Sequence, residues 1–223
     1  MQGPGATVNG RSLILSPPPT LRTEALRLGL DLSERDAARL VKLLDELARW
    51  NRTYNLTAIR TPEKMVTHHL LDSLAIHADL QGERVADVGT GAGFPGLPLA
   101  VVHPHRRFTL IDSNGKKVRF VSHAARLLEL TNVEARHARV ESVIGPFDSV
   151  IARAFAALPD LLPAIAALCD RHTRVVAMKG KWPAQELERL PAGWQVEYAR
   201  PIEVPGLGEQ RCVIALRRAG DAE

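Results

Sequence analysis

The sequence predicts an α/β protein in which a mostly parallel sheet follows a set of helices and ends in an antiparallel pair of strands. Three observations predict this fold. Amphipathic helical spacing dominates the first third of the chain, short apolar runs then alternate with helix-sized stretches, and the last two apolar runs have no helix between them. With 223 residues, 45% of them apolar, the chain can bury the core of one domain.

The first third is expected to be helical. A capping pattern over residues 33–36 opens an apolar stripe that continues to Tyr54. A second start signal at Thr61, with proline in the first turn, precedes helical spacing that continues to Ile76. We expect a disordered tail over 1–20, a helical segment packed on the core over 21–82, the core over 83–218 and a tail over 219–223.

Short apolar runs in the rest of the chain have the length of strands. Those separated by helix-sized stretches, of which 116–130 and 158–168 are the clearest, favour a parallel sheet covered on both faces. The last two are joined by a loop rich in proline and glycine, which is typical of an antiparallel pair. The predicted strands cover residues 84–88, 108–111, 133–136, 149–152, 174–178, 194–200 and 211–216.

Composition excludes several classes of protein. The longest apolar stretch, 161–169, is interrupted by Pro163 and is too short to cross a membrane, so we expect no membrane contact. The first twenty residues lack the pattern of a secretory signal, which favours the cytoplasm. Cys169 and Cys212 have neither CxxC spacing nor a nearby histidine pattern, so no metal site is expected.

A glycine-rich turn follows the first predicted strand, over residues 89–96. Glycines allow a sharp bend and let a ligand approach the backbone, and the helix that follows presents free N–H groups. The turn satisfies the dinucleotide pattern GxGxxG, so an NAD oxidoreductase is one interpretation. Three acids favour S-adenosylmethionine (AdoMet), which carries a cationic sulfonium and an amino group: Asp87 beneath the turn, Asp112 after the second strand, and Glu141 after the third. The antiparallel ending also suits the seven-stranded, Rossmann-like sheet of class I AdoMet-dependent methyltransferases.

Several motifs together resemble one family, the bacterial 16S rRNA guanine-N7 methyltransferases called RsmG, formerly glucose-inhibited division protein B. The resemblance extends from about Ser33 to Leu216. The string Thr-Gly-Ala-Gly-Phe-Pro-Gly at 90–96 is its most specific part, and the other motifs are Trp50-Asn51, 54–57, 69–73, Asp112-Ser113, 116–120, 139–141, 153–156 and Lys179-Gly180. The resemblance implies an enzyme that methylates N7 of a guanine in 16S rRNA, at the guanine-527 type position of the 530 loop. It also implies AdoMet contacts at Gly89, Phe94, Val140, Glu141 and Arg153.

The expected site residues form three sets. We assign the catalytic role to Arg153. The cofactor-binding set is Asp87, Gly89, Gly91, Gly93, Phe94, Asp112, Val140, Glu141 and Arg153. The set that contacts rRNA is Lys116, Lys117, Arg119, Lys179 and Arg211. Residues 103–126 hold six lysines and arginines against one acid, a concentration of positive charge that favours RNA phosphates. We expect His69 to be structural or to face RNA.

The end of the fourth predicted strand carries neither an Asn/Asp-Pro-Pro-aromatic run nor a cysteine nucleophile, but Arg153. An arginine cannot act as a base, and guanine N7 already has an exposed lone pair, so direct in-line methyl transfer without a general base is expected. The expected partner is 16S rRNA or a precursor of the small ribosomal subunit, and the expected state is a monomer. The alternatives are an AdoMet methyltransferase for another RNA, a protein or a small molecule, an NAD oxidoreductase, and a non-enzymatic RNA-binding module.

Overall fold

The computed structural model describes residues 19–220 of the chain. The tails expected at 1–20 and 219–223 therefore lie mainly outside the described residues. Helix α1 (Pro19–Arg27) begins within the last two residues of the first expected tail. No helix in residues 19–220 is both long and apolar enough to cross a membrane.

The N-terminal part is helical, as predicted. Helix α2 (Glu34–Tyr54) begins at the expected cap, where Ser33 Oγ accepts a hydrogen bond from Asp36 N at 3.1 Å. The helix predicted from Thr61 to Ile76 is instead divided. The structure has α3 (Pro62–Met65), the π-helix η1 (Val66–Leu71) and α4 (Asp72–Leu74).

The prediction of one regular helix was wrong here because apolar spacing does not reveal the extra residue of a wide turn. Such π-helical turns are rare and often occur at functional sites. This one leads directly into Asp72, whose carboxylate is part of the site described below.

Seven strands form one sheet in the order β3-β2-β1-β4-β5-β7-β6. The first five pair in parallel, and β7 is antiparallel to both β5 and β6, which confirms the predicted fold class. All seven predicted strands are present with small differences at their ends. They are β1 (Arg84–Val88), β2 (Arg107–Asp112), β3 (Val133–His137), β4 (Ser149–Arg153), β5 (Arg174–Lys179), β6 (Trp194–Ile202) and β7 (Arg211–Arg218).

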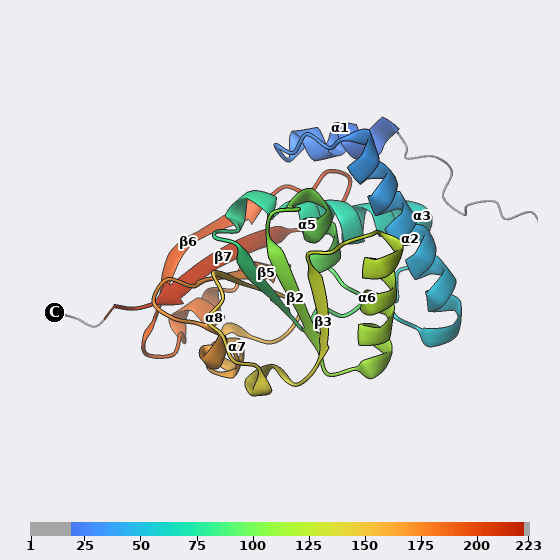
Figure 1. Cartoon of the computed structure of the whole chain (residues 1–223). Coiled ribbons are helices and arrows are strands. Elements are labelled where there is room, and N and C mark those ends of the chain that lie inside the picture. Colours follow the sequence, from blue (N-terminus) through green and yellow to red (C-terminus); the bar gives the residue numbers. More distant parts are fainter. Residues whose placement is uncertain (1–18, 221–223) are drawn as a thin grey trace, which may run out of the picture.

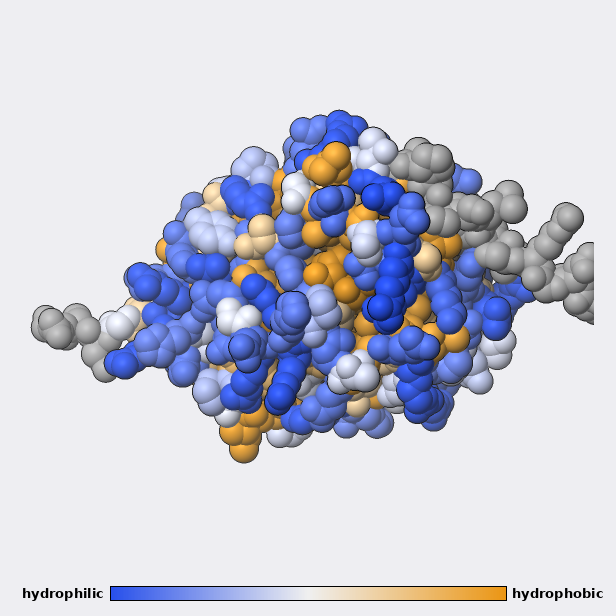
Figure 2. Space-filling model, turned by 45° about the horizontal axis from the view of Figure 1, so that its top comes forward, coloured by the Kyte–Doolittle hydropathy of each residue, from blue (hydrophilic) through white to orange (hydrophobic). Residues whose placement is uncertain are grey.

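Helices cover both faces of the sheet (Figure 1). One face packs against α1, α2, α5 (Gly96–Val102) and α6 (Gly115–Leu127), and the other against α7 (Leu158–Ala164). The short helix α8 (Ala184–Glu188) contacts α7. The surface over these layers is mainly hydrophilic, with small apolar areas (Figure 2). The central strands contribute alternate residues to the two cores: in β1, Val85 lies in one core and Ala86 in the other.

The strand order reverses beside β1, which has β2 on one side and β4 on the other. In open parallel sheets this reversal leaves a crevice at the carboxyl ends of the strands, where ligands bind. The carboxyl ends of β1, β2 and β4 lie at Val88, Asp112 and Arg153. The fold therefore brings three of the predicted site segments to one edge.

Candidate cofactor and substrate site

The glycine turn is held from beneath by Asp87, as the sequence predicted. This side chain is fully buried, and its Oδ2 accepts hydrogen bonds from Thr90 Oγ1 at 2.5 Å and from Gly96 N at 2.8 Å. Its Oδ1 has no hydrogen-bond partner within residues 19–220. Burial raises the pKa of Asp87 to about 6, because water is excluded from the carboxylate. Asp87 therefore acts on the shape of the turn.

The three predicted glycines of the turn differ in what surrounds them. Gly89, Gly91 and Gly93 all have positive φ, at 65°, 62° and 86°, which favours glycine. A Cβ at Gly93 would collide with Leu97, so this glycine allows the helix to pack closely. A Cβ at Gly91 would meet nothing nearer than a backbone oxygen at 4.0 Å. Gly91 thus borders open space, as expected where a ligand approaches the backbone.

A cavity of about 310 Å³ lies beside the turn, and we call it the loop cavity. Four residues of the predicted cofactor-binding set line it: Gly89, Asp112, Val140 and Glu141. Asp112 Oδ2 accepts a hydrogen bond from Gly91 N at 2.9 Å, and its Oδ1 accepts from Asn114 N at 2.8 Å. Each carboxylate oxygen can accept a further bond, so Asp112 can both fix the turn and receive hydroxyl groups. The lining is completed by Ile111, Ser113, Ala138, Arg139, Ala154 and Phe155.

A second cavity, of about 420 Å³, adjoins the first at Ala154, which lines both. We call it the arginine cavity, because Arg153 and Arg211 both line it. Its other residues are Ile59, His68, His69, Asp72, Met178, Lys179 and Gly180. Three residues that the sequence assigned separately to catalysis and to RNA contact, Arg153, Lys179 and Arg211, therefore meet in one hollow.

Asp72 joins the two arginines of this cavity. Its carboxylate is almost completely buried, with Oδ2 at 3.0 Å from Arg153 Nη1 and Oδ1 at 3.0 Å from Arg211 Nε. Arg153 Nη1 also donates to the backbone oxygen of His68 at 3.0 Å. No role for Asp72 could be predicted from the sequence, although it lies in the motif 69–73, because its partners come from strands 81 and 139 residues away.

His69 has a structural role in this arrangement. Its ring stacks on Phe94 with centroids 4.7 Å apart, and its Nε2 lies 3.2 Å from Thr57 Oγ1. Burial, and then the nearby Arg153 and His68 charges, lower the pKa of His69 to about 3, so the ring is neutral at physiological pH. Phe94 is 3% exposed and lines neither cavity, so its contact with a cofactor stays a prediction.

The predicted RNA contacts divide into two groups. Lys179 Nζ donates to Glu186 Oε2 at 2.7 Å and Arg211 binds Asp72, so both are engaged within the protein. The other group, Lys116, Lys117 and Arg119, lies in the first turns of α6, just after the end of β2. Asn114, which Asp112 binds, caps this helix by accepting from the backbone N–H groups of both lysines. This basic helix start therefore adjoins the loop cavity.

The positive charges over residues 103–126 were predicted to form a single basic surface, and this prediction was wrong. Arg106 and Arg107 lie at the amino end of β2, whereas Lys116 and Lys117 follow its carboxyl end. The six residues of β2 separate the two groups by about 17 Å. The chain thus carries positive charge at both edges of the sheet.

The strand order, the glycine turn at its reversal and the paired cavities define a protein with the class I methyltransferase fold. The chain belongs to the family described as rRNA small subunit methyltransferase G, which matches residues 36–214. This confirms the resemblance seen in the sequence. Two relatives with the name Ribosomal RNA small subunit methyltransferase G are each 44% identical to it. The one from Pseudomonas syringae pv. tomato aligns over 89% of this chain and 95% of its own length, and the one from Erwinia tasmaniensis over 85% and 94%.

Solved structures agree with the fold. A magnesium protoporphyrin IX methyltransferase from Synechocystis, solved with bound AdoMet, is similar at a TM-score of 0.57 and 17% identity, covering 83% of this chain and 98% of that one. TrmN from Thermus thermophilus is similar at a TM-score of 0.56 and 21% identity, covering 76% and 53%. At such identities these proteins support the fold.

The open space at Gly91 gives a first prediction. The Gly91→Val variant should bind AdoMet at least about tenfold more weakly, because the branched side chain occupies the space beside the turn. Gly29→Val is the matched control: Gly29 also has positive φ, 79°, and open surroundings, but lies between α1 and α2. Calorimetric titration measures both affinities. Equal affinity in the two variants would remove Gly91 from the cofactor site.

The buried carboxylate gives a second prediction. Because the pKa of Asp87 is about 6 in the folded state and 3.8 ordinarily, the folded state holds the proton more tightly. This contribution to stability is complete below the ordinary pKa and is lost as the pH rises through about 6. From pH 4 to 7.5 the free energy of unfolding of the parent, relative to Asp87→Asn, should fall by about 2 to 3 kcal/mol. Urea unfolding measures this difference in free energy. A difference that does not change with pH would contradict a buried Asp87 carboxyl group with a raised pKa.

Proposed function

We propose that this protein transfers a methyl group from AdoMet to N7 of a guanine in the 16S rRNA of the small ribosomal subunit, at the guanine-527 type position of the 530 loop. The observation that carries the proposal is the joining of the loop cavity and the arginine cavity at Ala154. The loop cavity fits a cofactor that has ribose hydroxyls and that lies close to the backbone of the turn. The arginine cavity fits the polar edge of a base. Membership of the rRNA small subunit methyltransferase G family supports rRNA as the substrate.

The loop cavity would hold AdoMet. Asp112 and Glu141 supply acceptors, Gly89 lies in the wall of the cavity beneath the Phe155 ring, and Gly91 leaves open space at the turn. The backbone of Val140 and Glu141 would complete the binding, while Asp87 and Gly93 keep the turn in shape. AdoMet would supply a methyl group activated by the sulfonium: the N7 lone pair would form the C–N bond in line as the C–S bond breaks, which leaves a neutral thioether and a cationic guanine ring.

Arg153 would contact the substrate or the cofactor carboxylate from the wall of the arginine cavity, next to Ala154, which lines both cavities. Its guanidinium is 20% exposed and keeps donors available after binding Asp72 and the backbone oxygen of His68. Such a group can bind guanine O6, a phosphate or a carboxylate. Asp72 acts through Arg153 and Arg211 as a positioning residue, because its two oxygens fix both arginines.

The side chains of the arginine cavity support a reaction without a general base. His69, with a pKa of about 3, is too weak a base at neutral pH. Both ring nitrogens of His68 are engaged: Nδ1 lies 3.1 Å from the oxygen of Lys64, and Nε2 lies 3.5 Å from Glu209 Oε1. Arg153 and Arg211 neutralise Asp72. Attack by N7 needs none of these to accept a proton, since no proton leaves the nucleophile.

The basic start of α6, with Lys116, Lys117 and Arg119, would bind phosphates next to the target guanine. Lys179 and Arg211 would contact rRNA from within the arginine cavity. We infer further that the protein works in the cytoplasm as a monomer, and that the reaction uses no metal.

The absence of a base gives a third prediction. Under single-turnover conditions, transfer of tritiated methyl from AdoMet to small-subunit RNA should vary less than about threefold from pH 6 to 9. Arg153→Gln should lower this rate about a hundredfold, as for loss of one charge-stabilising donor, without introducing a new titration.

A different profile would identify another acceptor. If the rate rises tenfold per pH unit and then levels off in the parent, but not in His68→Ala, a deprotonation is required. The N7 assignment would then be replaced by an exocyclic amine or a hydroxyl group.

A further inference from the structure

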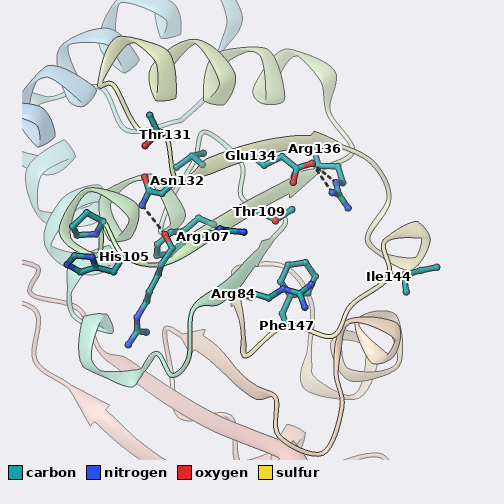
Figure 3. A pocket seen from close by; sticks show the side chains of 14 residues that line it. Arg84, His105, Arg107, Thr109, Thr131, Asn132, Glu134, Arg136, Ile144 and Phe147 are labelled. Carbon is teal, nitrogen blue, oxygen red and sulfur yellow. Dashed lines mark hydrogen bonds and ion pairs between the residues drawn. The ribbon is translucent and has the colours of Figure 1, made fainter.

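A separate basic cavity of about 520 Å³ lies at the opposite edge of the sheet, where β1, β2 and β3 begin. Figure 3 shows Arg84, Arg107 and Arg136 arranged around it, with Phe147 beside Arg84. The cavity extends along the strands to Thr109 of β2 and Arg136 of β3, and the loop cavity begins at Ile111 and Ala138, so the two hollows are about 7 Å apart along β2. No residue lines both, so the basic cavity is separate from the hollows proposed for methyl transfer.

The charges around this cavity are not balanced within the described part of the chain. Four of the lining residues are arginines, Arg84, Arg106, Arg107 and Arg136, and one is an acid, Glu134. Glu134 Oε1 binds Arg136 Nη2 at 2.7 Å. The nearby Asp148 uses its Oδ2 to accept the backbone N–H groups of Glu83 and Arg84. Even with Asp148 counted, the arginines near the hollow exceed the acids by two charges.

Arg106 shows this imbalance most directly. Its Nη1 is buried and has no hydrogen-bond acceptor among residues 19–220. Burial lowers the pKa of the Arg106 guanidinium, and the attraction of Asp148 offsets this only in part. A buried charged donor without an acceptor is unfavourable, and an oxygen of a bound anion would satisfy it.

The cavity is also held in shape. Asn132 Nδ2 lies within 3.3 Å of the backbone oxygens of Ala100, His103 and Arg106, which fixes the segment that carries the arginines. The guanidinium of Arg84 lies 5.3 Å from the centre of the Phe147 ring. Ile144 is 81% exposed on the rim and offers an apolar contact next to the charges. A guanidinium binds phosphate through two parallel hydrogen bonds, so a cluster of arginines favours phosphate over an isolated carboxylate.

We propose that this basic cavity is a second anchoring site for the RNA substrate, which binds backbone phosphates of a segment flanking the methylated guanine. The inference rests on the proposed function for the identity of the RNA. A folded RNA can contact both neighbouring hollows at once, and two anchors would fix the orientation in which the target base meets the arginine cavity.

The test compares two double variants by binding to small-subunit RNA. Arg84→Gln with Arg107→Gln removes two exposed charges from the cavity, whereas Arg35→Gln with Arg217→Gln removes two exposed charges that do not line it. The cavity variant should bind RNA about tenfold more weakly, and the slope of log affinity against log salt should fall by about 1.4. The control should stay within about twofold, and AdoMet affinity should be unchanged in both. Equal loss of RNA affinity in the two variants overturns the proposal.

A second arm separates RNA from a free nucleotide. Uridine monophosphate is titrated into the parent and the cavity variant. If it saturates the cavity at micromolar concentration and leaves RNA binding by the parent unchanged, the site serves a free nucleotide and the proposal is overturned. If the parent binds RNA through Arg84 and Arg107 but transfers no methyl group to it, the proposed function fails while this site stands.

Discussion

The buried carboxylate of Asp72 between Arg153 and Arg211 is the interaction on which the site depends. One side chain from the helical segment binds two strand ends that are separated in the sheet by β5. Removing one member of such a buried group leaves charge without a partner and is unfavourable by about 3 to 5 kcal/mol. The π-helical turn before Asp72 brings its carboxylate to this point, so the irregular helix and the strand ends form one unit.

Three acids at this edge of the sheet each hold a different part of the site in place. Asp87 lies beneath the turn and holds it through Thr90 and Gly96, and Asp112 holds the same turn from the side through Gly91 N. Asp72 holds the arginines. Electrostatic catalysis depends on charges that are fixed before reaction, and in the proposed reaction these carboxylates would provide that order without acting as bases.

Much of this could be predicted from the sequence because the signals are local. Alternating apolar runs predicted the strands, and the turn with Asp87 indicated the edge of the sheet at which we propose that AdoMet binds. What could not be predicted depends on contacts between distant segments. Asp72 meets its arginines only after the sheet forms, and one strand divides the basic run at 103–126 between two edges. The π-helix could not be predicted either, because apolar periodicity does not record an extra residue in a helical turn.

The central claim, that Asp72 works by holding Arg153, is tested most directly by a double-mutant cycle. Single-turnover methyl transfer is measured for the parent, Asp72→Asn, Arg153→Gln and the double variant, with circular dichroism and urea unfolding showing that each is folded. If Asp72 acts through Arg153, the double variant should be no slower than Arg153→Gln alone, within about threefold. Rate losses that multiply, so that the double variant is slower by the product of both, would contradict the account.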